Sequence, residues 1–155
     1  RHVASVLRGA DLIAQALVDG KSVVVHCSDG WDRTAQLCAL AQVMLDPFAR
    51  TLQGLAVVVE KDWLSFGHMF QKRLGHANAG ASDQRSPVFL QWLDAMHQLL
   101  LQFPSSFEYN ERLLAHIFQV ACSGAHGTFL FDSDRERCEH AVPLRCPSVW
   151  SEILE

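Results

Sequence analysis

The sequence predicts an α/β protein in which many helices accompany one central strand. Two observations predict this class: apolar residues recur at helical spacing over most of the chain, and a single short run is rich in β-branched residues. That run is Ser22 to His26, and its apolar residues do not alternate with polar ones. Such a pattern is typical of a strand that is buried on both faces of a sheet.

Helices are expected on both sides of this strand. Val3 to Val18 carries an apolar stripe at helical spacing and is predicted to be an amphipathic helix. Thr34 to Leu45 is rich in Ala, Leu and Gln, which favour helix, and it ends before Pro47. We also expect a helix over Thr51 to Leu64, although its segment Ala56 to Val59 fits a strand as well.

The rest of the chain is predicted to be helical apart from one long loop. Gly67 to Arg85 holds a cluster of Gly, Ala, Asn, Ser and Asp and is expected to be that loop. Ser86 as an N-cap and Pro87 in the first turn predict a helix that runs to about Gln102. The remaining expected elements are helices over Glu108 to Ala121, Asp132 to Glu139 and Ser148 to Leu154, with a turn at Gly124 to Gly127.

Composition and charge exclude several classes of protein. The 155 residues suit one domain, and 49% hydrophobic and 19% charged residues are normal for a globular core. The net charge of −4 argues against a domain held on nucleic acid or membrane by bulk positive charge. No apolar run approaches the roughly 20 residues needed for a transmembrane helix. The five cysteines contain no CxxC pair, which favours a reducing, cytoplasmic compartment.

A phosphate-binding loop is predicted where the strand ends. Cys27 follows the strand, five small or polar residues come next, and Arg33 opens a helix. A loop that leads into a helix directs successive backbone N–H groups at one anion, and the helix dipole adds about half a positive charge there. The expected phosphate-binding residues of this loop are Ser28, Asp29, Gly30, Trp31, Asp32 and Arg33.

The same loop predicts nucleophilic catalysis by Cys27. The positive field favours its thiolate, so its pKa should fall well below the free value of ~8.5. A thiolate under a bound phosphate can attack in line and form a cysteinyl-phosphate, while Arg33 grips two phosphate oxygens. Asp32 is the candidate general acid; Asp29 is the rival and could instead orient the loop or a substrate hydroxyl. No cluster of His and Cys ligands is visible, so we expect neither a metal nor a cofactor.

Arg85 is the candidate outside this loop. It lies in the predicted long loop, just before the helix that Ser86 and Pro87 open. It could contact a second phosphate of a bisphosphorylated substrate, because arginine suits that task. It could equally be a solvated surface arginine, and the sequence leaves both interpretations open.

Several segments resemble the myotubularin phosphoinositide 3-phosphatases. His26 to Thr34 reads HCSDGWDRT and resembles the signature loop of that family, and its Trp-Asp pair separates it from tyrosine phosphatases. Glu60 to His68, Arg85 to Gln91 and Gln102 to Glu108 also look like myotubularin segments, and Gly127 to Leu130 continues the similarity. The resemblance therefore covers most of the chain.

This resemblance implies a cysteine-dependent phosphatase fold that removes the 3-phosphate from phosphatidylinositol 3-phosphate and from the 3,5-bisphosphate. It implies Cys27 as nucleophile, Arg33 as phosphate clamp and Asp32 as acid. It also implies a cytoplasmic protein, peripheral on endosomal membranes, and it allows homo- or hetero-oligomers with related phosphatases. The rival functions are a protein tyrosine or dual-specificity phosphatase and a non-catalytic phosphoinositide-binding scaffold.

One predicted strand cannot form a sheet by itself. Members of the myotubularin family, which this sequence resembles, carry a lipid-binding domain and the first half of the phosphatase domain ahead of the signature loop. We therefore expect residues 1–155 to form the C-terminal part of a single phosphatase catalytic domain, whose other strands lie outside this sequence.

Overall fold

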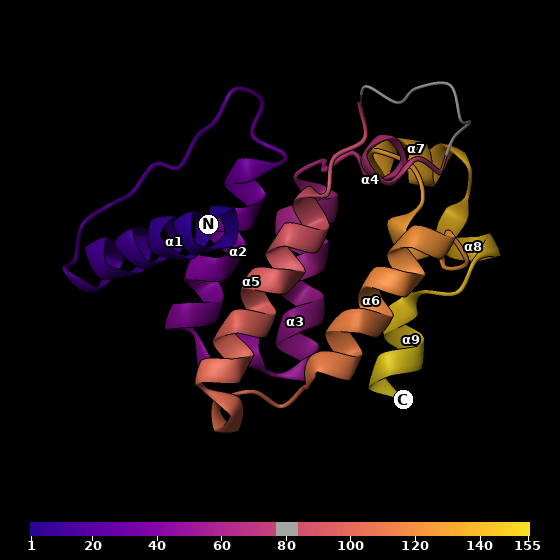
Figure 1. Cartoon of the computed structure of the whole chain (residues 1–155). Helices are drawn as coiled ribbons and strands as arrows, with labels where there is room; N and C mark the ends of the chain where they lie inside the picture. Colours follow the sequence, from indigo (N-terminus) through magenta and orange to yellow (C-terminus); the bar gives the residue numbers. More distant parts are fainter. Residues whose placement is uncertain (77–83) are drawn as a thin grey trace.

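All regular secondary structure is helical in the residues that the computed structural model describes, 1–76 and 84–155 (Figure 1). The longer helices are α1 (His2–Val18), α2 (Arg33–Leu45), α5 (Val88–Gln102) and α6 (Glu111–Ser123). The shorter α-helices are α3 (Leu52–Val58), α4 (Phe70–Leu74), α7 (Asp134–Glu139), α8 (Val142–Arg145) and α9 (Val149–Leu154). The 3-10 turns are η1 (Pro47–Arg50), η4 (Pro104–Ser106) and η5 (Gly127–Phe129), and η2 (Val59–Ser65) is a π-helical segment that continues α3.

The predicted α/β class and its central strand are wrong. Ser22 to His26 has no regular secondary structure, and no strand occurs within 1–76 or 84–155. Strand backbone must exchange N–H and C=O bonds with a neighbouring strand, and no described residue forms such bonds with Ser22 to His26. Val24, predicted to be buried, is 88% exposed. The β-branched run therefore forms part of the open connection between α1 and α2 (Figure 1).

The helices predicted around this connection are confirmed. α1 and α2 begin within a residue of their predicted starts, and α2 ends at Leu45 as predicted. The ambiguous valine segment is helical, because α3 and the π-helical segment η2 cover it. The side chain of Thr51 caps α3 by accepting the N–H of Gly54 at 2.9 Å, which satisfies one of the unpaired donors of the first turn.

The predicted long loop is only partly correct. It contains a helix, α4, which ends at Gly75 in the left-handed conformation (φ +81°) that glycine adopts without strain. The Gly/Ala/Asn/Ser/Asp cluster of this loop falls largely on 77–83, outside the described residues. α5 starts at Val88 with Pro87 as its N-cap, so Ser86 does not cap it as predicted.

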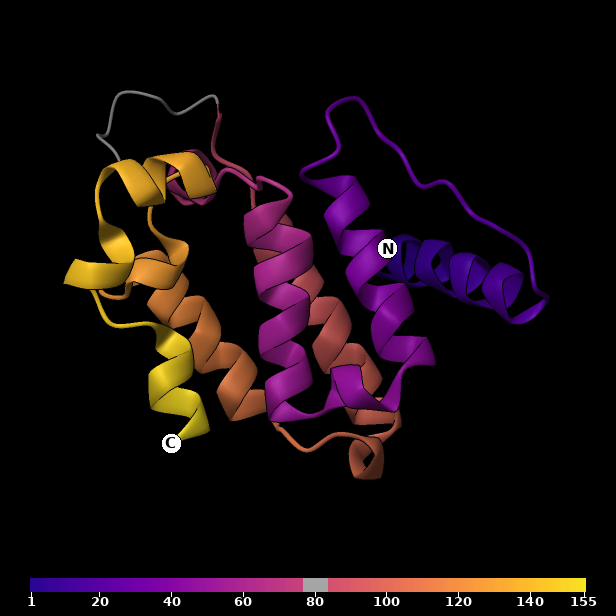
Figure 2. The same cartoon turned by 180° about the vertical axis from the view of Figure 1, so that it is seen from behind.

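The helices pack around one core. α5 contacts α2 on one side and α6 on the other, and α1 lies across α2, as the two opposite views show (Figures 1 and 2). The centre of the core is aromatic. The ring centroid of Trp63 lies 5.1 Å from that of Phe89, which it meets edge-on, and 5.4 Å from that of Trp92, to which it is tilted. These three side chains are almost completely buried. Because these side chains pack together, η2 is held against α5. The segment that follows η2 therefore lies beside the loop at the start of α2, where His68 contacts Trp31.

Candidate active site

Cys27 lies in a hydrogen-bonded turn at the start of α2. Its Sγ accepts the backbone N–H of Gly30 and the hydroxyl of Thr34, each at 3.2 Å. The bond from Thr34 contributes most, and with the backbone N–H groups of the loop it outweighs burial and lowers the pKa of Cys27 to about 6. Gly30 has φ +91°, a conformation that other residues rarely adopt. The loop therefore holds Cys27 largely as a thiolate at neutral pH.

The amino end of α2 faces the same loop. Asp32 is the N-cap residue of α2, but its side chain makes no capping hydrogen bond to the helix. Because the carboxylate is directed elsewhere, it does not occupy the first amide groups of the helix, which favour an anion. The exposed Arg33 donates from Nη2 to Ser28 Oγ at 2.9 Å, and Ser28 donates to Asp29 Oδ2 at 3.1 Å. The guanidinium thus lies back across the loop.

Asp32 is held by two basic residues from the segment after η2. Arg73 of α4 donates from Nε and Nη2 to Oδ2 at 3.1 and 2.9 Å. His68 Nδ1 lies 2.8 Å from the other oxygen, Oδ1. Burial acts to raise the pKa of Asp32, but the bonds from His68 and Arg73 prevail and lower it. Asp32 is therefore a paired carboxylate in the absence of substrate.

Sequence reasoning missed His68 and Arg73. They lie 36 and 41 positions beyond Asp32, so no local spacing joins them to the loop. The sequence held only a weak signal: His68 follows the aromatic residues Trp63 and Phe66 in a segment that resembles the myotubularins. Within the loop, the structure joins Cys27 with Gly30, and Arg33 with Ser28 and through it with Asp29.

Arg85 lies near this cluster without joining it. Among the described residues, no hydrogen bond connects Arg85 with the signature loop, 27–34. Its guanidinium packs against Gly75, so closely that a Cβ at Gly75 would come within 2.5 Å of Arg85 Nε. Its neighbour Gln84 accepts two bonds from Arg73 Nη1, each at 3.0 Å. Arg85 is an exposed residue, and its neighbour in the sequence belongs to the network that holds Asp32.

Neither a metal cluster nor a membrane span is found in the part of the chain that the structure describes. No group of three or more His, Cys, Asp and Glu side chains there is arranged to hold a metal ion. No helix there is both long and apolar enough to cross a bilayer.

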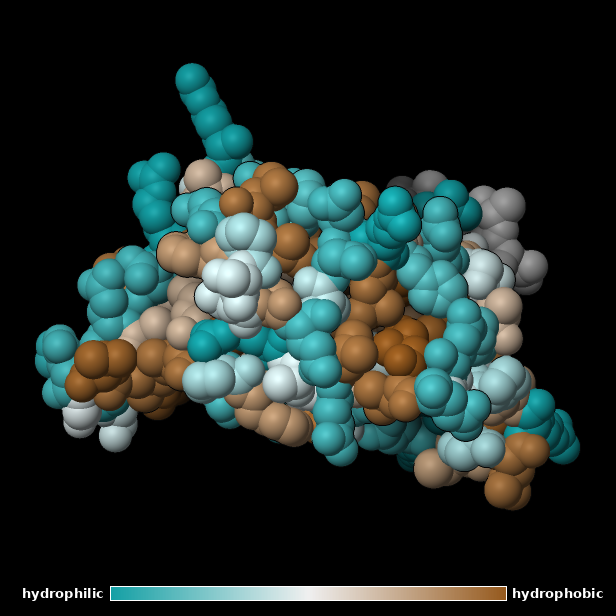
Figure 3. Space-filling view, turned by 90° about the horizontal axis from the view of Figure 1, so that it is seen from below, coloured by the Kyte–Doolittle hydropathy of each residue, from teal (hydrophilic) through white to brown (hydrophobic). Residues whose placement is uncertain are grey.

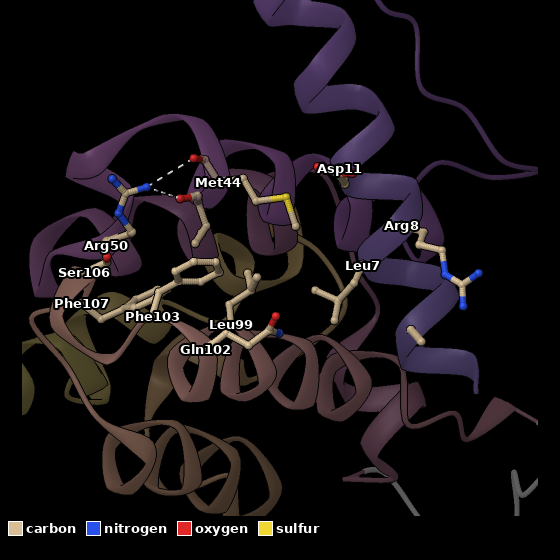
Figure 4. A pocket seen from close by; sticks show the side chains of 12 residues that line it. Leu7, Arg8, Asp11, Met44, Arg50, Leu99, Gln102, Phe103, Ser106 and Phe107 are labelled. Atoms are coloured by element: carbon tan, nitrogen blue, oxygen red, sulfur yellow. Dashed lines mark hydrogen bonds between the residues drawn. The ribbon is translucent and has the colours of Figure 1, made fainter.

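A cavity of about 640 Å³ lies apart from the signature loop. It is walled by α1, the end of α2 and α5, and Figure 4 shows Leu7, Leu99 and Phe103 lining it. Arg50 at its edge donates from Nη1 to the carbonyls of Val43 and Met44 at the end of α2, and its Nε is buried without a hydrogen-bond partner among the described residues. Hydrophobic side chains also gather on the lower face of the molecule (Figure 3), away from the loop at the upper end of α2 (Figure 1). Neither the cavity nor this hydrophobic face contains a residue predicted to take part in catalysis.

Comparisons with known proteins find relatives over nearly the whole chain. Residues 1–138 match the family model of the myotubularin-like phosphatase domain. The chain is 51% identical over 154 residues to the phosphatidylinositol-3,5-bisphosphate 3-phosphatase MTMR2 of Bos taurus, a match that covers 98% of this chain and 24% of the relative. It is 49% identical over 153 residues to the phosphatidylinositol-3,5-bisphosphate 3-phosphatase MTMR4 of Mus musculus. This match covers 97% of this chain and 13% of the relative.

Myotubularin of Xenopus laevis is also similar, with 48% identity over 154 residues, 98% of this chain and 26% of the relative. The chain thus spans about a quarter of the length of MTMR2 and of this myotubularin, and less of MTMR4. The family match extends well beyond the signature loop, over nearly all the residues. The resemblance seen in the sequence is confirmed, and the chain belongs to the myotubularin family.

Proposed function

We propose that these residues carry the nucleophilic half of a phosphoinositide 3-phosphatase, which acts on phosphatidylinositol 3-phosphate and on the 3,5-bisphosphate. The observation that supports this most is the Cys27 sulfur, which accepts bonds from Gly30 and Thr34 at the amino end of α2. The names of MTMR2 and MTMR4 support the phosphoinositide class and the 3-position. With only a quarter of MTMR2 covered, we further propose that residues 1–155 form the C-terminal part of one phosphatase domain.

The proposed reaction has two displacements at phosphorus. The Cys27 thiolate attacks the 3-phosphate, the S–P bond forms, and the P–O bond to the inositol breaks. Arg33 and the first amides of α2 balance the charge of the transferred group. The leaving inositol oxygen takes a proton from the general acid. Water then attacks the cysteinyl-phosphate, its proton returns to that carboxylate, and phosphate and the Cys27 thiolate are released.

Asp32 remains the proposed acid. It lies next to Arg33 inside the loop, whereas the side chain of Asp29 is exposed and receives a bond from Ser28. An acid must be protonated when the leaving group departs, and the lowered pKa of Asp32 opposes this in the free protein. A phosphate dianion bound in the loop would repel the carboxylate and raise its pKa, so substrate binding itself would favour the protonated form.

The test compares phosphate release by the full-length protein from short-chain phosphatidylinositol 3-phosphate, from its 3,5-bisphosphate and from a phosphotyrosine peptide. We expect turnover of the two lipids, little turnover of the peptide, and complete loss of turnover in Cys27→Ser with lipid binding retained. Activity in Cys27→Ser would exclude the covalent mechanism. Preference for the peptide would assign the protein to the tyrosine or dual-specificity phosphatases, and lipid binding without turnover to the scaffolds.

A further inference from the structure

His68 lies between the core and the signature loop. Its side chain is 0% exposed, and Nδ1 lies 3.0 Å from the carbonyl oxygen of Trp31 and 2.8 Å from Asp32 Oδ1. A carbonyl and an ionised carboxylate can only accept hydrogen bonds. Nδ1 therefore carries the proton, which it donates to the carbonyl of Trp31, and Asp32 Oδ1 lies close to it at 2.8 Å without an aligned hydrogen bond of its own.

The rest of the imidazole ring is enclosed by aromatic side chains. Trp63 meets it edge-on with the centroids 4.8 Å apart, and Phe70 does so at 4.7 Å. Nε2 is buried and has no hydrogen-bond partner among residues 1–76 and 84–155. A proton on Nε2 would be a buried donor without an acceptor, which is costly. The surroundings therefore favour the tautomer that carries its proton on Nδ1.

Arg73 alone does not fix the carboxyl group of Asp32. Both of its bonds go to the same oxygen, Oδ2, and leave rotation about the carboxyl axis possible. His68 approaches the other oxygen, Oδ1, from the core side. The short contact of Nδ1 with Oδ1 is electrostatic rather than an aligned hydrogen bond, and it restricts the rotation that the bonds from Arg73 leave open.

We propose that His68 is a positioning residue of the phosphatase reaction, whose Nδ1–H orients the Trp31–Asp32 segment of the loop and the carboxyl group of Asp32. This inference rests on the proposed function and specifies how its acid is placed. His68 does not touch the substrate in this scheme. Its effect passes through Asp32, so it should alter the departure of a poor leaving group more than phosphate binding.

A matched pair of substitutions separates hydrogen bonding from packing. His68→Phe keeps an aromatic ring between Trp63 and Phe70 but removes the donor. His68→Asn places an amide N–H near the position of Nδ1 but removes most of the ring. His97→Phe, on α5 and outside the hydrogen-bond network of the loop, makes the same chemical change as a control.

The measurements are kcat and KM of the full-length protein for short-chain phosphatidylinositol 3-phosphate and for an aryl phosphate, which has a good leaving group. We expect His68→Phe to lower kcat for the lipid by about tenfold to a hundredfold, because a misplaced acid costs that much. Its kcat for the aryl phosphate and both KM values should change little. His68→Asn should recover most of the lipid kcat, and His97→Phe should resemble the wild type.

Two results would overturn the inference while the proposed function stands. Unchanged lipid turnover in His68→Phe would show that the donor is not needed. Greater damage from His68→Asn than from His68→Phe would show that the ring acts through packing alone. A failure of the proposed function is recognised separately, by absent lipid turnover in the wild type or by activity in Cys27→Ser.

A spectroscopic measurement on the full-length protein tests the hydrogen bond itself, without any turnover and without a folded His68→Phe variant. In protein labelled with ¹⁵N-histidine, the His68 resonances, assigned by their loss in His68→Asn, should show a protonated Nδ1 and an unprotonated Nε2. Asp32→Asn should shift the Nδ1 resonance. A proton found on Nε2 alone would contradict the proposal whatever the enzyme kinetics.

Discussion

The reactivity of Cys27 depends on a side chain only seven residues away. Thr34 belongs to the first turn of α2, so its hydroxyl reaches Cys27 Sγ only if the loop folds back onto the helix. The bond stabilises the thiolate more than the thiol, because a hydroxyl donates more strongly to a negative charge. It is the largest single cause of the lowered pKa of Cys27.

Removal of this hydroxyl should make Cys27 less reactive near neutral pH. The thiolate fraction grows as the pH rises through the pKa, so iodoacetamide alkylation of Cys27 should reach half its maximal rate near pH 6. In Thr34→Val this midpoint should move to higher pH, whereas Thr34→Ser should keep it. Peptide mapping after alkylation checks this, with Cys122, whose pKa burial raises, as an internal reference. An unchanged midpoint in Thr34→Val would assign the shift to the backbone donors instead.

The two carboxylates of the loop should differ in what they do for the leaving group. Asp32→Asn removes the proposed proton donor and should slow hydrolysis of the lipid, whose leaving group is an alkoxide, by roughly a hundredfold or more. Hydrolysis of an aryl phosphate should suffer far less. Asp29→Asn is the matched change two residues from Cys27, and it should affect both substrates alike. A selective loss on the lipid in Asp29→Asn would transfer the acid role to Asp29.

At the scale of elements, α4 is too short to be stable by itself. It has five residues, fewer than an isolated helix needs, and its N-cap Met69 provides no capping hydrogen bond. Asp132, from the segment before α7, takes that place: its Oδ1 accepts the N–H of Lys72 at 3.1 Å, and its Oδ2 lies 3.6 Å from Lys72 Nζ. A distant carboxylate therefore caps the helix that carries Arg73 to Asp32.

Loss of this cap should affect both stability and catalysis. Asp132→Ala should cost about 1 kcal/mol of the free energy of unfolding, the usual cost of a lost cap, and should lower kcat for the lipid because Arg73 is less firmly placed. Asn110→Ala is the control, since Asn110 caps α6 by accepting from Arg112 and Leu113 at 3.0 and 3.3 Å. It should lose similar stability but keep kcat. Denaturant unfolding followed by tryptophan fluorescence, together with lipid kinetics, compares the two; equal kcat values would refute the role of Asp132.

Across the whole molecule, local patterns could be predicted from the sequence and distant contacts could not. The apolar stripe of α1 and the Cys27–Arg33 spacing are encoded within a few residues, so the helix and the loop followed from them. The strand at Ser22 to His26 failed because a strand depends on partners that composition does not reveal. His68 and Arg73 reach Asp32 only through the aromatic core and α4, a tertiary arrangement that no spacing encodes.

The charge of the whole molecule makes the recognition of a second phosphate a local matter. With a net charge of −4, the general field of the chain does not attract a polyanionic headgroup. The signature loop converges on one anion, so a 3,5-bisphosphate needs a further cation at its rim. Arg85 remains the candidate: it is exposed, it packs against Gly75 at the end of α4, and it follows Gln84, a partner of Arg73.

Arg85→Ala should therefore discriminate between the two lipids. A hydrogen bond to a charged group contributes about 1.5–3 kcal/mol, so KM for the 3,5-bisphosphate should rise by roughly tenfold or more. KM for the 3-monophosphate should change little. Arg112→Ala removes an equal charge from an exposed position on α6 and should alter neither value. If Arg85→Ala weakens both lipids equally, Arg85 supports the Arg73–Asp32 network instead; if it weakens neither, Arg85 is a solvated surface residue.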